Sequence, residues 1–173
     1  MFLRQLDYKL FNFVNGFAKR WRWLDYCGIF CAVYLIWFMA VAAFVFFWYL
    51  PTRINRLRYL FTLFASTAGA YIASAIVGFA YGRARPFVDL EGTRQLITTS
   101  FFHKSFPSSH ATVAFALAFT VLWFNRPWGI VMLILATAVA WGRVFVGVHY
   151  PMDVAAGAIL GGVVSYVMYR IIM

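Results

Sequence analysis

Long runs of uncharged residues limit what this chain can fold into more than any other feature does. Residues 26–50 contain no acidic or basic side chain, and residues 59–82 repeat the pattern. A helix of about 20 residues, rising about 1.5 Å per residue, crosses a hydrocarbon core of roughly 30 Å. We therefore predict an all-α integral membrane protein with five transmembrane helices, at about residues 26–50, 59–82, 108–125, 127–146 and 151–170.

The N-terminal segment has a different pattern. Residues 2–23 place leucine and phenylalanine at helical spacing with charged and amide residues between them, and end in a cluster of arginine, lysine and tryptophan. This pattern is typical of an amphipathic helix that lies at the membrane surface. We therefore expect a single membrane domain, residues 1–173, in which an interfacial helix at 2–23 precedes the five spans.

The charge balance favours a lipid environment. The chain is 64% hydrophobic and only 12% charged, with a formal net charge of +10. Because the basic residues flank apolar runs and do not gather on one polar surface, we expect the membrane, with its anionic lipids, to be the partner, and not nucleic acid. Cys27 and Cys31 lie within an uncharged run and are predicted to be packing residues.

Three short polar segments lie at the ends of these runs: Gly82-Arg83-Ala84-Arg85-Pro86, Phe106-Pro107-Ser108-Ser109-His110, and residues 142–153. If the five spans alternate in direction, all three meet at one membrane face. The opposite face receives basic residues without an acid, namely Arg53, Arg56, Arg58, Arg126 and Arg170. This asymmetry predicts that the opposite face is cytoplasmic. The polar segments would then face the periplasm or the cell exterior, although five spans also place the basic residues 19–22 on that side.

The residue types in these segments suit phosphate binding. Ser108, Ser109 and His110 head a predicted helix, and the free N–H groups and the dipole of a helix N-terminus favour an anion. Arginines that converge on this point would complete a pocket, because guanidinium groups pair with phosphate oxygens. With a single aspartate near the pocket, we expect no metal site.

Two histidines could supply the chemistry. His149 and Asp153 are four positions apart, so their side chains can meet on a helix or turn. A carboxylate that fixes one imidazole nitrogen makes the other nitrogen a nucleophile or a base. His110 could then act as the acid that protonates a leaving oxygen.

Together the three segments resemble the signature of the type 2 phosphatidic acid phosphatase (PAP2) family, which vanadium haloperoxidases share. The family pattern is K-x6-R-P, then P-S-G-H, then S-R-x5-H-x3-D. Arg85-Pro86 matches the end of the first motif, and Pro107-Ser108-Ser109-His110 matches the second. The third motif is matched by Arg143, His149 and Asp153. The resemblance covers roughly residues 60–170 and implies the helical bundle of this family.

The resemblance also implies a role for each matched residue. The phosphate would be held by Arg85, Ser108 and Arg143. His149 would form a phosphohistidine, Asp153 would orient His149, and His110 would protonate the leaving group. Neither a metal nor another cofactor would be required.

Three positions depart from the family pattern. The family lysine falls at Gly78, the glycine of P-S-G-H is Ser109, and the serine of S-R is Gly142. A charged contact to phosphate contributes about 1.5 to 3 kcal/mol, so the missing lysine matters most. We expect Arg83 or Lys104 to take its place, and the Ser109 backbone and hydroxyl to contribute to the phosphate site.

These features predict a membrane lipid phosphatase. An isoprenoid diphosphate, undecaprenyl diphosphate above all, is the expected substrate, because the chain resembles the small bacterial undecaprenyl-diphosphatase and lipid A phosphatase branch of the family. Lipid A phosphatase and phosphatidylglycerophosphate phosphatase activities are alternatives. Outside the class, the loss of lysine at Gly78 is compatible with a non-catalytic lipid-binding protein. Oxidation with bound vanadate is a third class, which the membrane spans disfavour.

Overall fold

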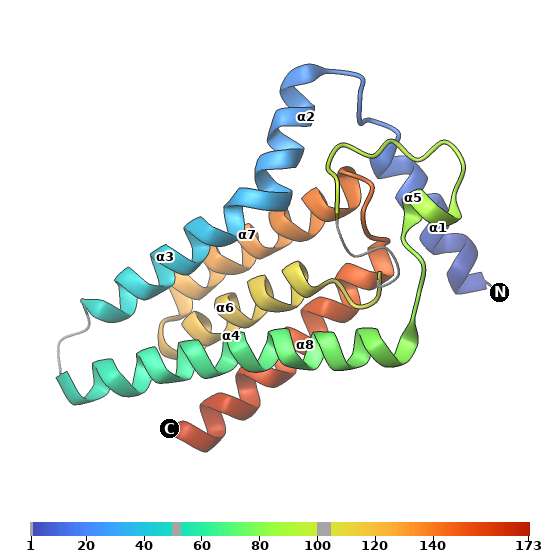
Figure 1. Ribbon diagram of the computed structural model, residues 1–173. Coiled ribbons are helices and arrows are strands. Elements are labelled where there is room, and N and C mark those ends of the chain that lie inside the picture. Colours follow the sequence, from blue (N-terminus) through green and yellow to red (C-terminus); the bar gives the residue numbers. More distant parts are fainter. Residues whose placement is uncertain (1, 50–52, 100–104) are drawn as a thin grey trace.

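Helices make up every regular element in the described part of the chain (Figure 1). The computed structural model describes residues 2–49, 53–99 and 105–173. Its elements are α1 (Phe2–Asn15), α2 (Arg22–Ile29), the π-helix η1 (Phe30–Tyr34), α3 (Leu35–Trp48), α4 (Arg53–Tyr81), α5 (Pro86–Asp89), α6 (Ser109–Phe124), α7 (Arg126–Phe145) and α8 (Pro151–Ile172).

Four helical segments are long and apolar enough to cross a membrane: Arg22–Trp48, Asn55–Asp89, Arg126–Phe145 and Pro151–Ile172. The first combines α2, η1 and α3. α6 is a shorter apolar helix of 16 residues, and at about 1.5 Å per residue such a helix covers only about 24 Å. The predicted all-α membrane class, with five apolar helices, is therefore confirmed.

Two helix boundaries differ from the sequence prediction. The arginine-rich segment 53–58, expected to connect two spans, forms the first turns of α4, because arginine and leucine are good helix formers. α1 ends at Asn15 and not near residue 23. At the end of α1, the Asn15 side chain donates hydrogen bonds to the carbonyl oxygens of Phe145 (2.8 Å) and Arg94 (3.0 Å), which belong to other segments. Leu50, the predicted end of the first span, lies outside the described residues.

α6 is the central helix of the bundle and packs against α4, α7 and α8. Alanine and threonine dominate its buried face, and small residues let helix backbones approach closely in a membrane. On α8, Gly157 and Gly161 face α6. A Cβ added at Gly157 would lie 2.9 Å from the Ser108 carbonyl oxygen, and one added at Gly161 would collide with the Thr112 carbonyl oxygen. The two helices therefore touch backbone to backbone.

This packing brings the polar segments to one end of the bundle. α4 and α7 finish there, and α6 and α8 begin there, whereas the C-terminus lies at the opposite end (Figure 1). The Ser108 N–H donates to the Asp153 carbonyl oxygen (3.0 Å), which ties the heads of α6 and α8 together. α1 lies beside this end and contacts α7 and α8.

Replacing Gly161 by alanine tests the contact between α6 and α8. A Cβ at Gly161 would collide with the Thr112 backbone, whereas at Gly162 it would meet only the Phe119 ring, at 3.0 Å. Both substitutions add the same helix-favouring residue, so their difference reports the collision. We expect Gly161→Ala to lower the free energy of unfolding by about 1–3 kcal/mol relative to Gly162→Ala. Thermal unfolding in detergent checks this, and a Gly161→Ala protein as stable as Gly162→Ala would contradict the close approach.

Candidate active site

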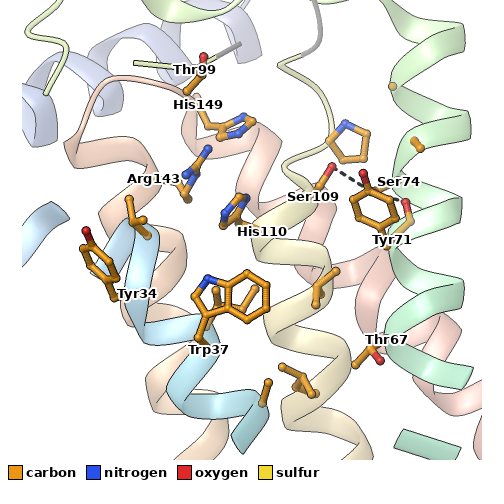
Figure 2. Close-up of a pocket in the computed structure, with 18 of the residues that line it drawn as sticks. Tyr34, Trp37, Thr67, Tyr71, Ser74, Thr99, Ser109, His110, Arg143 and His149 are labelled. Carbon is orange, nitrogen blue, oxygen red and sulfur yellow. Dashed lines mark hydrogen bonds between the residues drawn. The ribbon is translucent and has the colours of Figure 1, made fainter. Parts of the chain in front are cut away.

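A cavity of about 1300 Å³ lies between α3, α4 and α6 and reaches the end of the bundle where the polar segments meet. Its polar end is lined by Arg85, Arg143, His110 and His149. Figure 2 shows the side chains of the last three directed toward a common space. The remaining lining is mostly apolar and aromatic and continues along α3 and α4 as far as Leu60. The cavity therefore combines a charged head with a long apolar body.

Arg85 and Arg143 are the charged groups of this head. Their side chains are nearly buried, with exposed fractions of 6% and 5%, and no ion pair joins either of them to a carboxylate of the described residues. Arg85 donates to the Val148 carbonyl oxygen (3.3 Å) and Arg143 to that of Ala32 (3.2 Å). The Nε atom of each has no hydrogen-bond partner within the described ranges. Because a buried charge is costly unless it is paired, two such groups together favour an anion.

The N-terminus of α6 adds hydrogen-bond donors at the same end. Ser108 is its N-cap residue, is fully buried, and has an Oγ atom without a hydrogen-bond partner among the residues described. Ser109 lines the cavity, and its Oγ accepts a hydrogen bond from Ser74 Oγ of α4 (3.0 Å; Figure 2). The free N–H groups and the dipole of the first helical turn favour negative charge. This end of α6 therefore complements the two guanidinium groups.

His149 lies in the turn between α7 and α8 and is 2% exposed. Its Nδ1 is 2.8 Å from the carbonyl oxygen of Ser105. Because a carbonyl oxygen only accepts hydrogen bonds, Nδ1 carries the proton and Nε2 keeps its lone pair. Burial lowers the pKa of His149 to about 4, although the neighbouring Asp153 acts in the opposite direction. The imidazole is therefore neutral at physiological pH and can attack an electrophile or accept a proton through Nε2.

Asp153, at the head of α8, is fully buried and accepts three hydrogen bonds. Its Oδ2 accepts from Ser105 Oγ (2.5 Å) and from the Tyr150 N–H (2.9 Å), and its Oδ1 accepts from Arg83 Nη1 (2.6 Å). Asp153 Oδ2 lies 3.8 Å from His149 Nδ1. The sequence predicts that His149 and Asp153 meet, but the Nδ1–H of His149 donates its hydrogen bond to the Ser105 carbonyl oxygen and not to Asp153. Ser105 therefore links the carboxylate to the imidazole.

Of the two residues expected to replace the family lysine, the structure describes Arg83 but not Lys104. Arg83 donates to Asp153 and to Asp7, at 2.6 Å and 2.7 Å, and does not line the cavity. The structure thus places Arg83 against two carboxylates and outside the lining of the cavity. Gly78 does line the cavity, so the position of the family lysine faces the site. Lys104 lies outside the described residues, and its role stays a prediction.

The family serine is glycine in this chain, at Gly142, and the structure gives a reason. α7 approaches η1 so closely that a Cβ at Gly142 would lie 2.7 Å from the Ala32 nitrogen and 2.9 Å from the Cys31 Cβ. The same approach lets the Ala32 carbonyl oxygen accept a hydrogen bond from Arg143. Gly142 therefore helps to position one of the two buried guanidinium groups.

Two residues that contact Asp153 or its partner were not expected from the sequence. Ser105 bonds both Asp153 and His149, yet no recognised motif includes it. Asp7 belongs to the amphipathic segment, where a carboxylate is expected on the water side, but it is only 2% exposed and bonds Arg83. A signal for Asp7 was present in the composition, since a chain with few acids has few partners for a buried arginine.

Replacing Gly142 by alanine should disturb Arg143. The added Cβ forces α7 and η1 apart, and overpacking of this kind costs about 1–3 kcal/mol. We expect inorganic phosphate to raise the thermal unfolding temperature of Gly142→Ala less than that of the wild type. Gly69→Ala is the control, because its Cβ would meet only the side chains of Val164 (3.3 Å) and Met168 (3.6 Å). Equal stabilisation by phosphate in all three proteins would show that Gly142 has no part in placing Arg143.

Known proteins resemble this chain in sequence and in fold. The sequence profile of the PAP2 superfamily matches residues 59–173. The chain is 35% identical over 161 residues to the bacitracin transport permease protein BcrC of Bacillus licheniformis, and the aligned region covers 93% of this chain and 78% of that protein. It is 26% identical over 165 residues to the undecaprenyl-diphosphatase BcrC of Bacillus subtilis, covering 95% and 83%. The crystal structure of Aquifex aeolicus LpxE superposes with a TM-score of 0.75 at 20% identity, over 95% of each chain.

Proposed function

The chain belongs to the PAP2 superfamily, and from this premise we propose that it hydrolyses a lipid diphosphate, undecaprenyl diphosphate in particular, to the lipid monophosphate. The reaction takes place at the membrane surface and uses side chains alone. The proposal rests chiefly on two buried guanidinium groups that have no carboxylate partner in the part of the chain that the structure describes. They lie next to a neutral imidazole, at the head of an apolar cavity.

The shape of the cavity supports a lipid substrate. A phosphate at its polar end lies within reach of Arg85 and Arg143, while an apolar chain can follow the aromatic and aliphatic lining of α3 and α4. The relative from Bacillus subtilis acts, by its name, on undecaprenyl diphosphate. This relationship favours an isoprenoid diphosphate over lipid A or phosphatidylglycerophosphate, which remain the alternatives within the superfamily.

The first step transfers the terminal phosphoryl group to the protein. Arg85, Arg143 and Ser108 hold its oxygens, and the Nε2 lone pair of His149 attacks the phosphorus. The P–O bond to the lipid monophosphate breaks, and His110, from the first turn of α6, donates a proton to the leaving oxygen. A phosphohistidine and the lipid monophosphate result.

The second step restores the enzyme. Water attacks the phosphorus, His110 accepts the proton of that water, and the P–N bond to His149 breaks to release inorganic phosphate. Asp153 and Ser105 hold the Nδ1 side of His149, so that Nε2 remains the reactive atom throughout. Among the described residues, no group of three His, Cys, Asp or Glu side chains could hold a metal ion. The positive charge for phosphate comes from arginine in this mechanism.

The charge distribution supports an orientation for the site. α4 and α7 begin, and α8 ends, at the end of the bundle opposite the site, and these helix ends carry Arg56, Arg58, Arg126 and Arg170. Because basic residues are enriched on the cytoplasmic side, we place the site on the periplasmic or exterior face of a bacterial inner membrane.

The test is phosphate release by the purified protein in detergent with excess EDTA. Undecaprenyl diphosphate, lipid A, phosphatidylglycerophosphate and phosphatidic acid are offered in parallel, and His149→Ala is the control. We expect release that survives EDTA, is fastest with undecaprenyl diphosphate and disappears in His149→Ala. Faster release from another lipid would replace the substrate, and loss of activity in EDTA would contradict the metal-independent mechanism. No release from any lipid would favour a non-catalytic lipid-binding protein.

A further inference from the structure

We propose that Asp7 and Arg83 are positioning residues for the reaction, and that α1 is therefore part of the catalytic apparatus as well as a membrane-surface helix. The proposal rests on the proposed function, because it concerns the carboxylate that serves His149. It starts from a row of three charged side chains, Asp7, Arg83 and Asp153, which joins α1 to the head of α8.

The row is continuous and closely spaced. Asp7 Oδ2 is 2.7 Å from Arg83 Nη2, and Arg83 Nη1 is 2.6 Å from Asp153 Oδ1. The guanidinium of Arg83 also lies over the Tyr150 ring, 4.0 Å from its centroid. The two carboxylates are 2% and 0% exposed, and Arg83 is 20% exposed. Water screens these charges little, so each side chain constrains the next.

Asp7 also holds the first turn of α8. Its Oδ1 accepts a hydrogen bond from the Met152 N–H (2.9 Å), one of the donors that an α-helix leaves unpaired at its N-terminus. Met152 immediately precedes Asp153 in the sequence. Asp7 therefore acts on Asp153 twice, once through Arg83 and once through the backbone that carries it.

Other contacts dock α1 independently of Asp7. Phe11 is fully buried and packs edge-on against the Tyr150 ring at 5.4 Å. Tyr8 donates a hydrogen bond to Asp89 (2.7 Å), and Asn15 bonds the backbone at the far end of the helix. Removing the charge of Asp7 should consequently leave α1 in place and alter Arg83 and Asp153.

The expected effect reaches His149 through two hydrogen bonds. Without the carboxylate of Asp7, Arg83 can turn, and Asp153 loses a fixed donor on Oδ1. Asp153 Oδ2 is bonded to Ser105 Oγ, and the Ser105 carbonyl oxygen accepts the Nδ1–H of His149. The nucleophile is thus held less well, while Arg85 and Arg143, which face the substrate phosphate, are unchanged. We expect catalysis to fall with little effect on substrate binding.

The experiment compares Asp7→Asn, Asp7→Glu and Glu91→Gln in the full chain, on the best lipid substrate. Glu91 is an exposed carboxylate of the loop at the same end of the molecule, so its variant controls for the loss of one charge. We expect Asp7→Asn to lower kcat at least tenfold with KM within about threefold of wild type. Asp7→Glu, which keeps the charge, should recover part of the rate, and Glu91→Gln should have the wild-type rate.

Coupling to Arg83 is measured by combining Asp7→Asn with Arg83→Gln. Because Asp7 acts partly through Arg83 and partly through the Met152 N–H, Asp7→Asn should slow the Arg83→Gln protein by a much smaller factor than it slows the wild type, since effects in one network do not multiply. A wild-type kcat in Asp7→Asn, a change confined to KM, or fully multiplicative effects would each overturn the proposal. If the wild-type protein releases phosphate and Asp7→Asn does so at the same rate, only this inference is overturned and the proposed function stays intact.

A second readout requires no turnover. The proton on His149 Nδ1 gives a nuclear magnetic resonance signal that is identified by its absence in His149→Ala. We expect this signal to shift in Asp7→Asn and to stay in place in Glu91→Gln, because only Asp7 is connected to the Ser105 bond that holds this proton. An unshifted signal in Asp7→Asn would refute the positioning role even if no tested lipid were hydrolysed.

Discussion

Burial of two guanidinium groups that form no ion pair with any carboxylate of the described residues is the constraint on which this structure depends. Arg85 lies in the link between α4 and α5, Arg143 lies in the last turn of α7, and both are almost entirely out of water. Like charges in such surroundings repel each other, and each is costly to desolvate. The bundle must therefore hold them in place by rigid packing, which the backbone contacts of α6 with α8 and of α7 with η1 supply. In the proposed mechanism, a phosphate bound between the two guanidinium groups offsets this electrostatic cost.

The separation of charges within the site is as important as their presence. Asp153 could cancel the charge of Arg85 or Arg143 if it were free to turn toward them. Instead its oxygens are bonded by Arg83, Ser105 and the Tyr150 backbone. Arg83 thus serves the carboxylate, which leaves the other two arginines available to the substrate. Gly78 stands where the family has lysine, and the described cavity lining contains no charge that replaces it. In the proposed mechanism, phosphate binding therefore depends on the two arginines and on the N-terminus of α6.

Much of the fold and of the site was predictable because both depend on local patterns. Uncharged runs predict apolar helices, and alternation of the spans brings Arg85, Ser108, Arg143 and His149 to one end. The charge before position 59 predicts a connection, whereas the helix propensity of arginine and leucine prevails and extends α4 to Arg53. The burial of Asp7 opposes its local pattern, since an amphipathic helix normally turns its acids toward water, and only the scarcity of acids in the chain pointed to it. Ser105 was missed because its contacts arise from the path of a loop, which periodicity does not encode.

The central claim is that His149 carries the phosphoryl group during turnover. It is tested most directly by mixing the protein with a lipid diphosphate whose terminal phosphate is radioactive and quenching within the first turnover. We expect a covalent label on the peptide that contains His149, stable in alkali and lost in acid, as is typical of a phosphorus–nitrogen bond. The label should be absent from His149→Ala. Rapid turnover without a covalent label, or a label on another residue, would contradict the account.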